Sequence, residues 1–108
     1  MKDSRCYKRT STIPIKGVMW HSTGANNPTI KRYVQPDRKD PNYPTLIKTI
    51  GKNRNSNDWN SSQASETTHA VIGKLENGSI ACVQCLPWNY RSWGCGNGSK
   101  GSGNDYFI

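Results

Sequence analysis

The chain has 108 residues, a length that allows one domain at most. Hydrophobic residues make up 32% of it, so the core is small, and the four tryptophans must supply much of the buried area. Lysine and arginine outnumber aspartate and glutamate by 15 to 7, which favours anionic partners such as nucleic acid, anionic lipid or a wall rich in phosphate polymers. No apolar run reaches the roughly 18–20 residues of a membrane span, so we expect no membrane insertion.

The N-terminal third is predicted to present a histidine at the end of a strand. Residues 1–12 are polar and are expected to form a loosely held arm, anchored only by Cys6 and Tyr7. The apolar run that follows predicts a strand over about 15–20, with Met19 and Trp20 in the core. His21 comes where this run stops, and strand ends often carry side chains that ligate metals or move protons. A histidine that merely ends the strand is the alternative.

Two short helices are predicted next. Asn27 suits an N-cap and Pro28 the first helical position, and Ile30, Tyr33 and Val34 follow at helical spacing. Residues 45–51 predict one or two further turns, with Thr45 as the cap and Gly51 as the stop. The polar stretch 52–65 reads as a long loop that only Trp59 is suited to hold against the rest of the chain.

Residues 68–86 carry the strongest local signal, a β-hairpin with Asn77-Gly78 as a type I′ turn. A two-residue turn pairs Glu76 with Ser79 and Ile72 with Val83. One face would then be shared by His69, Val71, Leu75, Ile80, Cys82 and Leu86. Cys82 and Cys85 have the spacing of a zinc knuckle, but residues three apart in a strand point to opposite faces, which favours free thiols.

The loop 87–96 is rich in aromatic residues and provides candidate binding residues: Trp88, Tyr90, Arg91 and Trp93. These side chains suit stacking on sugar rings or nucleobases, and the alternative is that the tryptophans fill the core. Residues 105–108 predict the start of another apolar strand. We therefore expect the end of the chain to interrupt a domain.

Three segments, 17–28, 69–79 and 86–96, together resemble one family. They are similar to zinc-dependent N-acetylmuramoyl-L-alanine amidases of the peptidoglycan-recognition fold, especially phage and prophage endolysins of Gram-positive bacteria. The run Trp20-His-Ser-Thr-Gly24 is the most specific part, and the resemblance reaches roughly the first two thirds of the family domain. It implies an α/β fold with a mixed central β-sheet and packed helices, as one domain over residues 1–108, apparently truncated at the C-terminus.

The resemblance also implies a chemistry. Members cleave the amide between N-acetylmuramic acid and L-alanine with water activated by Zn²⁺, and His21 matches the first zinc histidine. The other two ligands follow, in the family, after the last residue of this sequence, so a homo-oligomer is a candidate way to complete the site. His69 and Thr68 are the candidate catalytic positions. Thr68 stands where some relatives carry Tyr or Glu, and Gly94 where close relatives often carry His.

Trp88, Tyr90, Arg91 and Trp93 are the candidate substrate-binding residues, and peptidoglycan is the implied partner. The chain shows no signal peptide, which fits endolysins that accumulate in the host cytoplasm before they act at the cell wall. Two other functions stay open. A non-catalytic peptidoglycan-binding module would bind the wall without forming product, and a basic single-stranded nucleic-acid binder would lose affinity steeply with salt.

Overall fold

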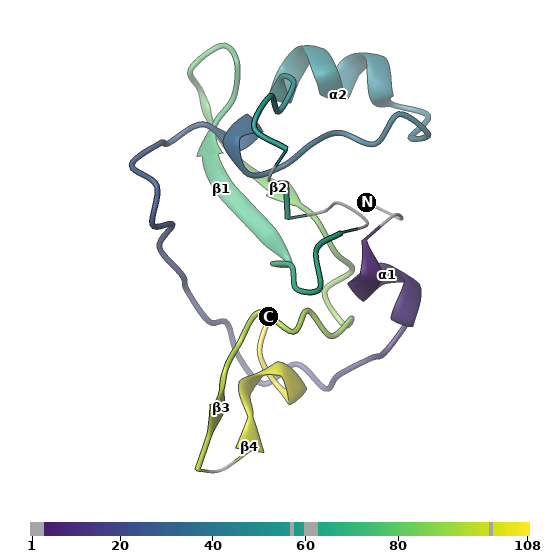
Figure 1. The fold of residues 1–108 in the computed structure, drawn as a ribbon, viewed down its shortest axis with the longest axis vertical. Coiled ribbons are helices and arrows are strands. Elements are labelled where there is room, and N and C mark those ends of the chain that lie inside the picture. Colours follow the sequence, from purple (N-terminus) through teal and green to yellow (C-terminus); the bar gives the residue numbers. More distant parts are fainter. Residues whose placement is uncertain (1–3, 57, 60–62, 100) are drawn as a thin grey trace.

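The computed structural model describes residues 4–56, 58, 59, 63–99 and 101–108. A central hairpin has α2 beside its turn, and a smaller hairpin lies at the opposite end of the molecule (Figure 1). In chain order the elements are α1 (Arg5–Arg9), the 3₁₀ helix η1 (Ile30–Arg32), α2 (Tyr43–Ile50), β1 (Ala70–Lys74), β2 (Ile80–Gln84), β3 (Asn97–Gly98), β4 (Gly101–Ser102) and the 3₁₀ helix η2 (Gly103–Asp105).

The strands form two separate antiparallel pairs, β1 with β2 and β3 with β4. Helices and strands are both present, as an α/β chain requires, but the predicted mixed central sheet is wrong for the described residues. Parallel pairing occurs only as single bridges, for example Gly17 with Phe107. The segment predicted as a strand over 15–20 pairs along one edge only, and Ile15 and Val18 remain 47% and 56% exposed. It is therefore an extended segment beside the C-terminal residues.

The β1–β2 hairpin is present, but its register differs by one residue from the prediction. Ile72 faces Cys82 instead of Val83. The Gly78 N–H donates to the Leu75 carbonyl at 3.0 Å, and the Leu75 N–H donates to the Ser79 carbonyl at 2.9 Å, so the loop has three residues. A type I′ turn needs positive φ at both central residues, whereas only Gly78 has it, at 84°. The loop is a type I turn followed by a glycine bulge.

This register decides which face of the hairpin is buried. Val71 faces Val83 on the inner side, while Ile72 and Ile80 lie on the outer face and are 55% and 66% exposed. The predicted grouping of Ile80 and Cys82 with Val71 is therefore wrong. The inner face packs on η1, the residues after it, and α2. The core comprises Ile30, Tyr33, Val34, Ile50, Val71 and Cys85.

Both predicted helices lie close to their predicted positions, but only the second is an α-helix. α2 begins two residues before the predicted cap, with Asn42 as N-cap, and ends as predicted before Gly51, whose φ is 92°. The predicted helix after Asn27 is only the single 3₁₀ turn η1, preceded by Thr29. The Asn27 side chain accepts a hydrogen bond from the Thr29 N–H at 2.9 Å, which closes a turn before the helix can begin there.

The N-terminal segment forms α1 within the part of the chain that the structure describes. Ser4 caps this helix by accepting from the Tyr7 N–H at 3.2 Å. Cys6 is fully buried, and its thiol donates to the Ser92 carbonyl at 3.1 Å. Tyr7 contacts the ring of Tyr90, with a centroid distance of 5.5 Å. Among the described residues, no helix is long and apolar enough to cross a membrane.

Candidate functional site

One cavity of about 650 Å³ collects most of the predicted site residues. Its walls come from residues 18–24, from 66–72 at the start of β1, and from the loop between 88 and 95. We call it the His21 groove. Four of the predicted residues line it, namely His21, Thr68, His69 and Trp88. The fold thus brings together segments that lie far apart in the sequence.

His21 is exposed at the mouth of this groove. The extended segment before it is fixed by the C-terminal residues, since the Met19 N–H donates to the Ile108 carbonyl at 2.8 Å. The Ile108 N–H in turn donates to the Gly17 carbonyl at 3.1 Å. A short parallel pairing therefore sets the position of His21, although no regular strand is formed.

The loop after His21 is anchored by Tyr33, which is 5% exposed. The Tyr33 hydroxyl donates to the Asn27 carbonyl at 2.7 Å and lies 3.0 Å from Thr23 Oγ1. Thr23 Oγ1 also donates to the Ala25 carbonyl at 3.0 Å. These bonds tie the loop to the main core, so the chain that follows His21 is held in one position.

His69 is buried, with 3% of its surface exposed, and borders the groove from the start of β1. Its Nε2 lies 2.6 Å from the Tyr90 carbonyl oxygen. A carbonyl only accepts, so Nε2 carries the hydrogen and Nδ1 holds the free lone pair. Burial lowers the pKa of His69, and the hydrogen bond to the Tyr90 carbonyl opposes this only in part. The ring is therefore neutral near pH 7.

Thr68 lies beside His69 and its hydroxyl donates to the Ala70 carbonyl at 3.2 Å. This bond is local, and no ionisable side chain among the described residues is hydrogen-bonded to the hydroxyl to activate it as a nucleophile or an acid. Thr68 can position a substrate by hydrogen bonding. Acid–base chemistry would have to come from another residue of the groove.

The predicted aromatic residues do not act as one group. Trp88 lines the groove, is 43% exposed, and stacks on His69 at a centroid distance of 6.3 Å. Trp93 lies outside the groove lining, and its ring centroid is 4.6 Å from the guanidinium carbon of Arg9 and 5.0 Å from that of Arg91. Arg91 also pairs with Asp105 at 3.0 Å, and Tyr90 supplies the carbonyl that holds His69. Three of the four therefore do not line the groove.

Trp20 and Met19 belong to the groove, and their predicted place in the core is wrong. Trp20 is 76% exposed and Met19 is 40% exposed, and both line the cavity. In the part of the chain that the structure describes, the apolar side chains of this extended segment stay largely exposed, with Val18 at 56%. Trp59 lines the groove as well, and its N–H donates to the Tyr33 carbonyl at 2.9 Å. The predicted anchoring role of Trp59 is confirmed.

The described residues do not fit a three-ligand zinc site within one chain. They contain no group of three His, Cys, Asp or Glu side chains placed to hold a metal ion. His69 uses Nε2 for the Tyr90 carbonyl, and burial raises the pKa of the Cys95 thiol beside it in the groove lining. Cys82 is exposed while Cys85 is buried, so these two thiols diverge as predicted. His21 is left as the one exposed imidazole of the groove.

The chain was compared with known proteins. No protein-family model, no curated protein and no solved structure matches this sequence. The function must therefore be argued from the groove itself together with the resemblance described above.

Proposed function

We propose that the chain is a cell-wall-directed domain that binds peptidoglycan in the His21 groove. The observation that carries this is the composition of one cavity, in which exposed Trp20 and half-exposed Trp88 lie with the polar groups of His21 and Thr68. Sugar rings offer apolar faces for tryptophan and hydroxyl and amide groups for polar partners. Glycopeptides combine the two, so they suit this lining better than a purely apolar ligand.

Binding is tested by sedimenting the labelled protein with purified Gram-positive peptidoglycan from which phosphate polymers have been removed. Trp20→Ala should weaken binding about tenfold or more, because exposed tryptophans at the centre of a contact often dominate its energy. The matched control is Ile80→Ala, which removes an equally exposed apolar side chain from outside the groove. Equal binding of Trp20→Ala and the wild type would refute the assignment of the groove.

Hydrolysis of the N-acetylmuramoyl-L-alanine amide is the second candidate function. It is supported by the resemblance around His21 and by the position of this exposed histidine in the same cavity as Thr68 and His69. Zn²⁺ would require further ligands, which a second copy of the chain is one way to supply. The test is release of L-alanine amino groups from peptidoglycan. Activity that persists in His21→Ala would refute a role for His21, and saturable binding without product would leave a recognition module.

A further inference from the structure

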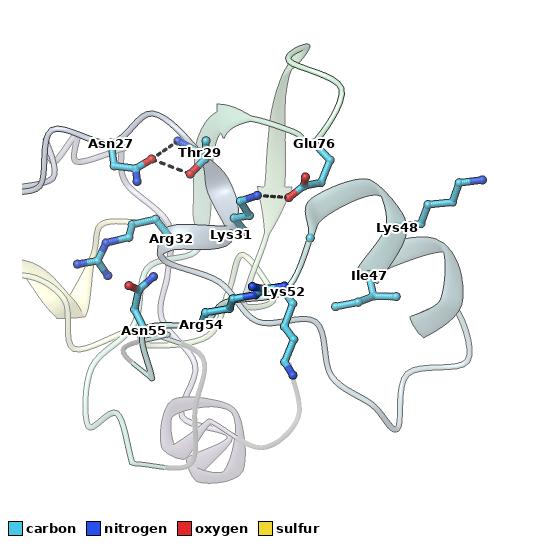
Figure 2. Close-up of a pocket in the computed structure, with 11 residues that line it drawn as sticks. Asn27, Thr29, Lys31, Arg32, Ile47, Lys48, Lys52, Arg54, Asn55 and Glu76 are labelled. Atoms are coloured by element: carbon cyan, nitrogen blue, oxygen red, sulfur yellow. Dashed lines mark hydrogen bonds and ion pairs between the residues drawn. The ribbon is translucent and has the colours of Figure 1, made fainter.

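A second cavity of about 650 Å³ lies between η1, the C-terminal end of α2 and the hairpin turn, and it is strongly basic (Figure 2). Among the described residues, its lining contains five cationic side chains and a single carboxylate. The cations are Lys31, Arg32, Lys48, Lys52 and Arg54, and the carboxylate is Glu76. We call it the basic cavity. None of its lining residues belongs to the His21 groove.

The single carboxylate is already neutralised. Glu76 pairs with Lys31 at 2.5 Å, the contact drawn in Figure 2, and the Glu76 N–H donates to the Thr49 carbonyl at 3.0 Å. Lys48 extends outward from α2, away from the other cations (Figure 2). Arg32, Lys52 and Arg54 therefore remain without a carboxylate partner in the part of the chain that the structure describes.

The loop after α2 holds two of these cations in place. Asn53 is 8% exposed, its N–H donates to Gln35 Oε1 at 2.8 Å, and its side-chain oxygen accepts from the Asn55 N–H at 2.7 Å. Because Asn53 faces inward, its neighbours Lys52 and Arg54 both lie on the exposed side. Their charges are thus presented by fixed backbone, which reduces the entropy lost when an anion binds.

Arg32 adds an unsatisfied donor. Its Nη1 is buried and has no hydrogen-bond partner among the described residues. Buried guanidinium nitrogens are normally hydrogen-bonded, since leaving one unpaired costs free energy. Figure 2 shows this guanidinium directed away from Lys31 and Lys52, so Arg32 would meet an oxyanion at the edge of the cavity. A basic cavity with an orphan donor is the arrangement expected of an anion site.

We propose that the basic cavity binds the phosphodiester groups of a polyol-phosphate polymer of the bacterial wall, a proposal that rests on the proposed function. Single-stranded nucleic acid is the other polyanion to consider, but its binding sites stack bases on aromatic side chains, and none of the described residues that line this cavity is aromatic. Thr29 and Asn55 instead offer a hydroxyl and an amide, groups that suit the hydroxyls of a polyol. The cavity would hold the domain on the wall while the groove engages the glycopeptide.

The experiment measures binding of labelled poly(glycerol phosphate) by fluorescence anisotropy. The double variant Lys52→Gln/Arg54→Gln should weaken it about tenfold or more. The matched control Lys8→Gln/Arg38→Gln loses the same charge at exposed positions outside the cavity and should stay within about twofold. Glu76→Gln should bind more tightly, because it releases Lys31. These changes should shrink as salt is raised.

Three results would overturn the proposal. Equal losses in the two double variants would mean diffuse attraction to the whole basic surface. Tighter binding of an oligothymidylate with the same number of phosphates, lost in Lys52→Gln/Arg54→Gln, would make it a nucleic-acid site. Absence of polymer binding would remove the site altogether. Phosphate-free peptidoglycan is measured in parallel, so that failure there, with polymer binding intact, would count against the groove and not against the basic cavity.

Discussion

Acidification should destabilise the folded chain through His69. This side chain is buried and its pKa is lowered, chiefly by burial. In the unfolded chain the ring titrates near its ordinary value of about 6.5. Between the two pKa values the unfolded state therefore binds one more proton than the folded state. The contribution of the neutral His69 ring to the free energy of unfolding should be complete above about pH 6.5. It should decrease as the pH drops below that value toward the pKa of His69 in the folded state.

The size of this pH effect is set by the single proton that His69 binds in the unfolded state. The slope of the free energy of unfolding against pH cannot exceed about 1.4 kcal/mol per pH unit, and it approaches that limit only below the unfolded pKa. Against a typical total of about 5–15 kcal/mol for a small domain, one unit of acidification is easily measured.

Urea unfolding between pH 5.5 and 7.5 tests this, because that range spans the ordinary histidine pKa of about 6.5. His69→Phe keeps an aromatic ring against Trp88 but cannot titrate, so its stability should vary much less with pH. It should also be less stable at pH 7.5 by about 1–3 kcal/mol, because the Tyr90 carbonyl loses its donor. Ile80→Ala, which removes no titratable group, should keep the wild-type pH dependence. A slope that survives in His69→Phe would refute the reasoning.

Three further predictions concern packing and thiol chemistry. Gly51→Ala should cost about 1–3 kcal/mol in urea unfolding, because its φ of 92° is a backbone conformation that residues with a Cβ rarely adopt, and the new Cβ would also displace the Glu76 carboxylate. Gly24→Ala, which has open space around it, should change stability by less than about 0.5 kcal/mol. Leu86→Ala should cost about 2–5 kcal/mol, since Leu86 is 1% exposed, and a loss no larger than that of Ile80→Ala would contradict its burial. A thiol reagent at neutral pH should modify Cys82 in the folded protein and spare Cys85, whose pKa burial raises to about 12; a rapid reaction that persists in Cys82→Ser would place the reactive thiol elsewhere.

The hairpin shows how far the sequence alone could carry the prediction of the fold. Asn77-Gly78 between two β-prone runs located it, because the signal is local. The predicted strand register is wrong by one residue, because a type I′ turn requires positive φ at Asn77 and this residue does not adopt it. The residue type alone does not decide which φ an asparagine adopts. The end of α2 was found because Gly51 is a local stop signal. The missing central sheet depends on which segments pair at long range, and no local pattern records this.

For the His21 groove, too, local features could be predicted from the sequence and long-range features could not. His21 could be found from its place after an apolar run and from the resemblance around it. That His21, Thr68 and Trp88 border one cavity is a tertiary fact, set partly by the pairing of Gly17 with Phe107. Trp20 was placed in the core because apolar residues usually are buried, and only the structure shows that no element covers it. An exposed tryptophan directly before the histidine was the overlooked signal.

The most direct measurement follows the backbone amide and indole NMR signals while N-acetylmuramoyl-L-alanyl-D-isoglutamine is added. This ligand contains the sugar, the amide and the first stem residues that the groove is proposed to hold. The account predicts saturable shifts at Trp20, His21, Thr68 and Trp88, with Lys52 and Asn55 of the basic cavity unaffected. Shifts confined to residues outside the His21 groove, or none at millimolar ligand, would contradict it.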